Sequence, residues 1–174
     1  GTPEHDQISQ KALEARTALA NYIGNTPWVD ANKDNPAAIQ NAERLVRGGL
    51  RQAAAQHTNN GKQALVAAND TSDPSRQLEL VNRAANEYKL AAIGWQGYLK
   101  QDENAPDAYE SRYWLADALH LGVALEVALG RSPSAGAIAR ARAAAVVARD
   151  APGDDLYRQP AAVMVVDIAE QAVS

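Results

Sequence analysis

Asp117 and His120 have residue types and a spacing that could support acid–base chemistry. They lie three positions apart, so on a helix both side chains would point to the same side. A carboxylate beside an imidazole can orient the ring as a general base. However, the chain has no Gly-x-Ser-x-Gly segment, where the serine nucleophile of α/β-hydrolases is found. We therefore interpret the pair as hydrogen-bonded or solvated on the polar edge of a helix, or as lining a groove, and assign no catalytic residue.

A short polar segment matches part of a calcium-binding loop. Asp30, Asn32 and Asp34 stand at the first ligand positions of such a loop. The pattern also needs a glycine after the third ligand and a glutamate at its twelfth position, and Asn35 and Asn41 occupy those places. Because asparagine followed by proline is typical of a helix N-cap, we interpret the segment as a polar turn with a cap at Asn35.

Other metal and cofactor chemistry finds little support in the sequence. The three histidines are far apart and form no His-Glu-x-x-His motif, and there is no cysteine to supply a thiolate ligand or a disulfide. The segment Arg47-Gly48-Gly49 lacks the lysine and the serine or threonine of a phosphate-binding loop. We therefore predict no metal site and no cofactor.

The composition predicts the kind of fold that must position these side chains. The chain has 174 residues, 37 of them alanine, with no phenylalanine. Alanine is the strongest helix former, so we expect one all-α domain over residues 1–174, which could be a piece of a longer protein. The net charge of −4 gives no support for a nucleic-acid partner. The apolar stretch 119–129 is too short and too polar to span a membrane, so no membrane insertion is predicted.

Capping residues and apolar residues at spacings of three and four predict six or seven helices and no strand. The expected helical segments are 3–22, a helix that begins at Pro36, 63–68, 75–100, 108–129, 135–150, and a last one from 157 or 160 to 173. A polar linker is expected over 28–35 and a turn over 57–61, and a break near 91–94 is left open. The helix at 108–129 is apolar nearly all round, which predicts a central position. The pair Gly48-Gly49 predicts close packing against a neighbour, or a kink.

One segment has the order of residues expected at the junction between two helical hairpins. An aromatic residue and a leucine stand near the end of one helix, Ala-Pro-Asp follows, and the next helix opens with aromatic residues, a leucine and an alanine. These residues are Trp95, Tyr98, Leu99, Ala105, Pro106, Asp107, Tyr109, Tyr113, Trp114, Leu115 and Ala116. The order resembles the tetratricopeptide repeat, in the variety found in bacterial envelope proteins, and the resemblance covers residues 76–130.

Two weaker copies of this pattern flank the clear one. One would lie over 37–74 and the other over 144–167. In the second copy Tyr157 parallels Tyr109, but the prolines of the two junctions are 46 residues apart, whereas repeats of this family are about 34 residues long. The resemblance implies a TPR-like α-solenoid, which is a stack of antiparallel helical hairpins, with a groove that holds a peptide or protein and no shared catalytic residue.

From these observations we expect a non-enzymatic scaffold that binds a protein or peptide in a helical groove. Such grooves are lined by the first helix of a hairpin, which here carries Tyr109, Arg112, Asp117 and His120. Two alternatives stay open. One is an all-α enzyme or small-molecule binder that uses Asp117 and His120 in a cavity, and the other is a structural spacer that forms a homo-oligomer through the alanine-rich face 137–148. The resemblance implies the periplasm or cell envelope of a bacterium, and the cytoplasm is the other expected location.

Overall fold

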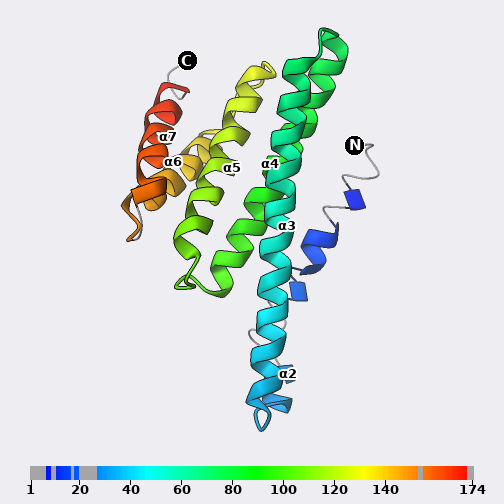
Figure 1. Cartoon of the computed structure of the whole chain (residues 1–174), viewed down its shortest axis with the longest axis vertical. Coiled ribbons are helices and arrows are strands. Elements are labelled where there is room, and N and C mark those ends of the chain that lie inside the picture. Colours follow the sequence, from blue (N-terminus) through cyan, green and yellow to red (C-terminus); the bar gives the residue numbers. More distant parts are fainter. Residues whose placement is uncertain (1–6, 9–10, 17, 20–26, 153–154, 172–174) are drawn as a thin grey trace.

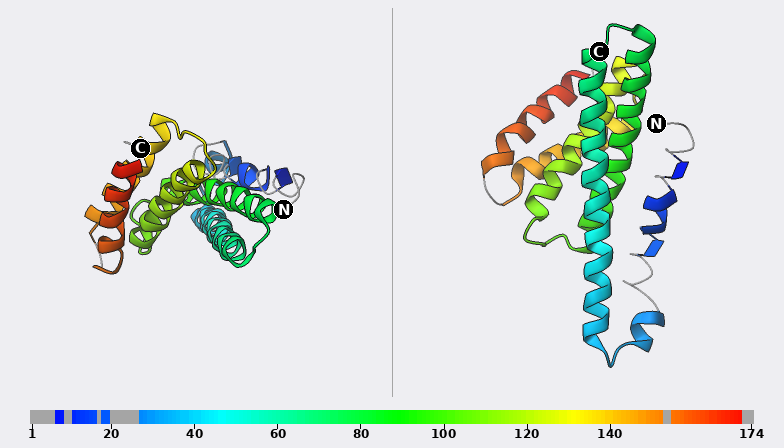
Figure 2. Two further views of the ribbon diagram at one scale, coloured as in Figure 1. Left: turned by 90° about the horizontal axis from the view of Figure 1, so that it is seen from above. Right: turned by 45° about the vertical axis from the view of Figure 1, so that its right-hand side comes forward.

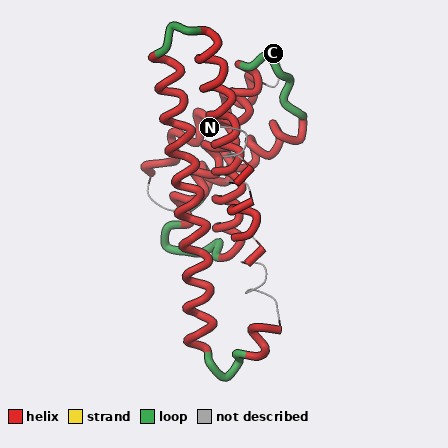
Figure 3. Tube along the Cα trace, turned by 90° about the vertical axis from the view of Figure 1, so that its right-hand side faces the viewer, coloured by secondary structure: helices red, strands yellow, loops and turns green. Residues whose placement is uncertain are grey.

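The computed structural model describes residues 7–8, 11–16, 18–19, 27–152 and 155–171. The elements in Figure 1 are α2 (Pro27–Ala31), α3 (Pro36–Asp70), α4 (Pro74–Gln101), α5 (Ala108–Ala128), α6 (Ala135–Asp150), the short 3₁₀ helix η1 (Asp155–Tyr157) and α7 (Arg158–Gln171). Every regular element in these ranges is a helix, as Figure 3 also shows, so the predicted all-α class is confirmed. The predicted helix at 3–22 lies partly outside the described residues, and its described positions are helical. Across the described ranges, no helix combines the length and the apolar character that crossing a membrane requires.

Helix α3 runs without interruption from Pro36 to Asp70, so the predicted turn at 57–61 and the separate segment at 63–68 are wrong. Its buried positions follow one another at spacings of three and four, which is the pattern of one continuous helix. They include Leu50, Ala54, His57, Gly61, Ala64 and Ala68. Packing of this face therefore outweighs the turn preference of Asn60-Gly61. Most of the range 37–74 is this single helix, so the helical hairpin expected there is not found.

Helices α3 and α4 approach each other closely at Gly94. A Cβ atom added there would lie 2.8 Å from the Cβ of Ala54 and 3.1 Å from its Cα. Helix α4 passes this point unbroken, so the break considered near 91–94 is absent from this described helix. At Gly48 and Gly49 an added Cβ would meet nothing in the described chain within 4 Å. Close packing is therefore not found at this glycine pair within the described chain, whereas it occurs at Gly94.

The segment that leads into α3 ends in the cap expected from its sequence. Residues 28–31, part of the expected polar linker, instead belong to helix α2. Asn35 then accepts a hydrogen bond through its Oδ1 atom from the backbone N–H of Ala38 (3.2 Å). The predicted cap at Asn35 is confirmed, and the linker prediction is wrong over its first half.

The helices follow one another across the molecule in chain order. Figure 2 shows α3 and α4 side by side at one edge, α7 at the other, and α5 between them. Consecutive helices from α3 to α7 pack against each other, and α5 also packs against α7. The N-terminal part of α3 extends beyond α4 and meets α2 (Figure 1). Helix α5 is thus flanked by helices on two sides.

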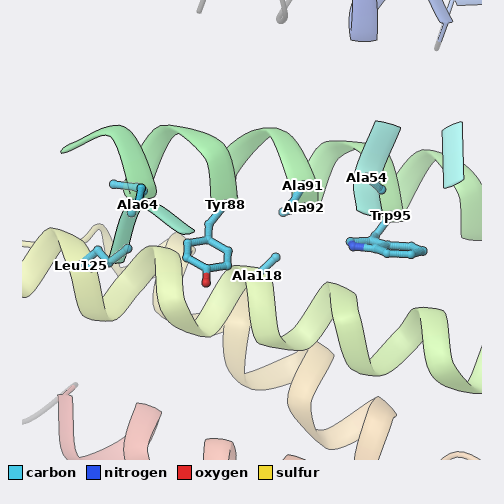
Figure 4. Packing of buried hydrophobic residues seen from close by; sticks show 10 residues of the cluster. Ala54, Ala64, Tyr88, Ala91, Ala92, Trp95, Ala118 and Leu125 are labelled. Carbon is cyan, nitrogen blue, oxygen red and sulfur yellow. The ribbon is translucent and has the colours of Figure 1, made fainter. Parts of the chain in front are cut away.

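Two hydrophobic clusters meet at α5. The first joins it to α3 and α4, and Figure 4 shows Tyr88 and Trp95 of α4 directed toward α5, where Ala118 lies. The second joins it to α6 and α7, with Ala116 and Ile168 among its buried members. The central position predicted for this helix is therefore confirmed.

Candidate functional site

All four residues predicted to bind a partner lie on α5, but they do not share one side of it. Tyr109 contacts η1, and His120 lies near Asp167 of α7. Asp117 is influenced by the charge of Lys62 on α3, whereas Arg112 lines a groove together with residues of α4 and α6. Arg112 and Asp117 are five positions apart, which corresponds to a rotation of about 140° around a helix. All four side chains are half-buried. The structure therefore places the four residues against different neighbours, and Arg112 lines a groove that the other three do not line.

Tyr109 belongs to a cluster of aromatic rings at the start of α5. Its ring centroid lies 5.5 Å from that of Tyr157, and its hydroxyl oxygen accepts a hydrogen bond from the Tyr157 backbone N–H (3.1 Å). Tyr113 stacks on Tyr157 with a centroid distance of 4.5 Å, and the Trp114 centroid lies 5.0 Å from that of Tyr113. The Nζ atom of Lys62 lies 4.1 Å from the Trp114 ring centroid, which is a cation–π contact. The cluster therefore ties α3 and η1 to α5 and brings together the two tyrosines that hold parallel places in the sequence pattern.

The ionisation of Asp117 and His120 is governed first by burial. Burial raises the pKa of Asp117, although the positive charges of Lys62 and His120 oppose this rise. Burial lowers the pKa of His120, although the carboxylates of Asp167 and Asp117 act in the opposite direction. The Nε2 atom of His120 lies 3.8 Å from Oδ2 of Asp167 on α7, and the His120 side chain is 13% exposed. Both shifts favour uncharged forms, whereas an ionised carboxylate is what best orients a histidine base.

Salt bridges from α3 hold the connection between α4 and α5. The Nη1 atom of Arg47 lies 2.6 Å from Oδ2 of Asp102, and the Nε atom of Arg51 lies 2.7 Å from Oδ2 of Asp107. The hydroxyl of Tyr98 on α4 also donates to Asp107, and burial together with this bond raises the pKa of Tyr98 to about 12. These contacts fix where α5 begins and therefore how its side chains are presented.

Arg112 lines a groove of about 410 Å³ between α4, α5 and α6, which we call the α4–α6 groove. Its lining residues are Gln96, Leu99, Lys100, Glu103, Arg112, Leu115, Ala143, Ala144 and Val147. Most of them are aliphatic, and Val147 is 52% exposed. The charged members come from the end of α4, its connection to α5 and the first turns of α5. An apolar lining with charge at one end is suited to binding a peptide segment.

The buried pair of His57 and Glu87 was not expected from the sequence. The Nδ1 atom of His57 on α3 lies 2.7 Å from Oε2 of Glu87 on α4, and Asn60 donates to the same oxygen (3.2 Å). The spacing of the buried residues along α3 could have revealed this pair. His57 stands three positions after Ala54, on the face of α3 that packs against α4. The expected turn at 57–61 concealed this spacing. The pair joins the two helices and lies apart from the residues predicted to bind a partner.

Within the described residues, no three His, Asp or Glu side chains lie close enough together to hold a metal ion. Comparison of the chain with models of protein families, with curated proteins and with solved structures found no match. The resemblance to tetratricopeptide repeats therefore stays a prediction.

Proposed function

We propose that the chain is a non-enzymatic scaffold that binds a segment of another protein in the α4–α6 groove. The observation that supports this function is that three successive helices line one groove with aliphatic side chains and with charge at one end. Protein interfaces combine an apolar centre with a polar rim, and arginine is enriched in them. Arg112, which the sequence also suggests as a binding residue, is part of this groove.

An enzyme or small-molecule binder that uses Asp117 and His120 has less support. A deep cavity around His120 would favour that function. Four hollows in the described part of the surface are lined by other side chains. Both residues are half-buried, and Asp167 of α7 lies within 4 Å of the His120 ring. The groove is therefore the better candidate for a binding surface.

A spacer that forms a homo-oligomer through the face 137–148 also has less support. Ala141, Ala145 and Ala148 on this face are buried within the chain, where they pack in the cluster shared with α5 and α7. The small side chains thus serve contacts between helices of one molecule. A homo-oligomer formed through this segment would have to use its exposed residues, such as Ala143 and Val147.

The resemblance to repeats of bacterial envelope proteins supports a location in the periplasm or cell envelope. There, the scaffold would hold one component of an assembly against another. Fractionation of cells that contain the protein, followed by immunoblotting, tests this location. Recovery in the cytosolic fraction alone would contradict it.

Affinity capture with two matched variants tests the groove. Val147→Asp places a charge in the groove, and Val163→Asp places the same charge on α7, where the valine is 53% exposed compared with 52% for Val147. Substitutions at such exposed positions change stability little, and thermal unfolding checks this for both variants. The wild type and V163D should retain the same proteins from soluble and envelope fractions. V147D should fail to retain them. Equal retention by all three forms would contradict the proposal.

A further inference from the structure

We infer that the occupant of the α4–α6 groove is an amphipathic α-helix that carries acidic side chains. This inference rests on the proposed function, because it specifies the partner of the same groove. Three features of the groove lead to it, namely its backbone, its apolar lining and the charge of Arg112.

The backbone around the groove favours a helical occupant over an extended one. Strand addition needs a sheet edge with unpaired N–H and C=O groups, but the three walls of the groove are the helices α4, α5 and α6, whose backbone groups pair within each helix. Polyproline segments bind in grooves lined by aromatic rings, and the lining residues of this groove include none. A helix laid along α5 can contact α4 and α6 on its two flanks, at the spacing of about 8–10 Å that is usual for packed helices.

The apolar lining fits one stripe of such a helix. Leu99 of α4, Leu115 of α5 and Val147 of α6 place one aliphatic side chain on each wall. Ala143 and Ala144 are small, so an occupant can approach α6 closely. Leucine-sized side chains at spacings of three and four on the occupant would fill the space between the walls.

Arg112 supplies the charge that selects an acidic helix. Its guanidinium donates to the carbonyl oxygen of Glu103 (2.6 Å) and has no carboxylate within 4 Å among the described residues. By contrast, Arg47 on α3 is paired with Asp102. Lys100 adds a second positive side chain to the lining, against one negative side chain. A carboxylate of the occupant beside Arg112 would form a charge-assisted hydrogen bond, which is stronger than a neutral one.

A displayed library of random 16-residue peptides tests this inference without a known partner. Peptides are selected on the wild type and counter-selected on V147D, with V163D as the matched control. We expect the survivors to carry aliphatic residues at spacings of three and four, to have a net negative charge, and to become helical when bound, as circular dichroism measures. Survivors that are net basic, extended or rich in proline would overturn the inference and leave the proposed function standing. If no peptide distinguishes V147D from the wild type, the proposed function itself fails.

Charge reversal at Arg112 separates ion pairing from damage to the fold. R112E should weaken the binding of a selected acidic peptide about tenfold, as fluorescence anisotropy measures. The same peptide with its acidic residues changed to lysine should bind R112E more tightly than the wild type, which a structural defect could not produce. Arg142→Glu, at an exposed position of α6 outside the groove, should leave both affinities unchanged. If R112E and the wild type bind both peptides equally, the acidic preference is overturned. If sedimentation shows that the wild type self-associates and that V147D does not, the occupant of the groove is a second copy of the chain instead.

Discussion

The Nδ1 atom of His57 on α3 lies 2.7 Å from Oε2 of Glu87 on α4, and Glu87 is 2% exposed. Burial raises the pKa of Glu87, but the hydrogen bond and the positive charge of His57, the hydrogen bond of Asn60 and the positive charge of Arg83 outweigh burial and leave the pKa below its usual value. The carboxylate is therefore ionised at neutral pH inside the contact between the two longest described helices. A buried charge of this kind has to stay paired, so the contact strongly constrains how α3 and α4 pack.

Glu87→Ala should lower the free energy of unfolding at pH 7 by about 3 kcal/mol, because it removes one partner of a buried pair. The folded-state pKa of Glu87 is lowered, so its ionisation stabilises the fold above about pH 4.5, and this contribution is lost as the pH falls through the folded-state pKa. Urea unfolding between pH 7 and pH 3 should give a difference between wild type and variant that shrinks toward the acidic end. A difference that stays constant over this range would contradict a stabilising role for the ionised carboxylate.

Gly94→Ala and Gly48→Ala should change stability in opposite directions. At Gly94 the new Cβ would lie 2.8 Å from the Cβ of Ala54, so α3 and α4 must move apart, which costs about 2 kcal/mol. At Gly48 the new Cβ meets nothing within 4 Å in the described chain, so the better helix propensity of alanine should stabilise the protein by about 1 kcal/mol. Urea unfolding of the two variants measures both effects. Equal shifts in the same direction would contradict the difference in packing between the two glycines.

His120→Gln should reduce the loss of stability on mild acidification. Burial lowers the pKa of His120 in the folded state, so below about pH 6.5 the unfolded chain binds more protons than the folded chain. Stability that depends on the neutral ring is therefore present at neutral pH and is lost as the pH falls. Between pH 7.5 and pH 5, the unfolding free energy of the wild type should therefore fall by more than that of H120Q. A difference that moves in favour of the wild type would mean that the charge of Asp167 outweighs burial.

Asp117→Asn should stabilise the protein at neutral pH. Burial raises the folded-state pKa of Asp117, so its ionisation opposes folding once the pH rises above the unfolded-state value near 3.8. Asparagine has nearly the same shape without the charge. We expect the Tm at pH 7 to rise by about 2 °C, and the gain to disappear at pH values below 3.8. Differential scanning calorimetry measures both, and a lower Tm at pH 7 would show that the attraction of Lys62 for this carboxylate is the larger effect.

Local signals in the sequence predicted the helices whose ends are capped. The predicted range 135–150 is the observed extent of α6, because Ser134 caps it by accepting from the backbone N–H of Ala137 (3.1 Å) and Ala151-Pro152 ends it. The continuity of α3 could not be predicted in this way. It depends on packing against α4, and the pair that marks this packing, His57 with Glu87, is 30 residues apart in the sequence. The spacing of three and four along α3 is a local trace of this packing, but the turn preference of Asn60-Gly61 concealed it.

The separation of Arg112 from Asp117 around α5 could have been predicted. Arg112 and Asp117 are five positions apart, and helical geometry alone separates them by about 140°. Arg112 and Asp117 were expected in one site because both lie on one helix, and the side of the helix that each occupies was not considered. The α4–α6 groove itself could not be predicted, because it depends on where α4 and α6 lie around α5.

Packing between helices that follow one another in the chain also orders the events of folding. Contacts between neighbouring segments close short loops, which favours rapid folding. During synthesis on the ribosome, α3 and α4 can pair and bury Glu87 before α6 has been translated. The α4–α6 groove includes Ala143, Ala144 and Val147 of α6, so it is completed later. A nascent chain therefore acquires a folded hairpin before it acquires a surface that can hold a partner.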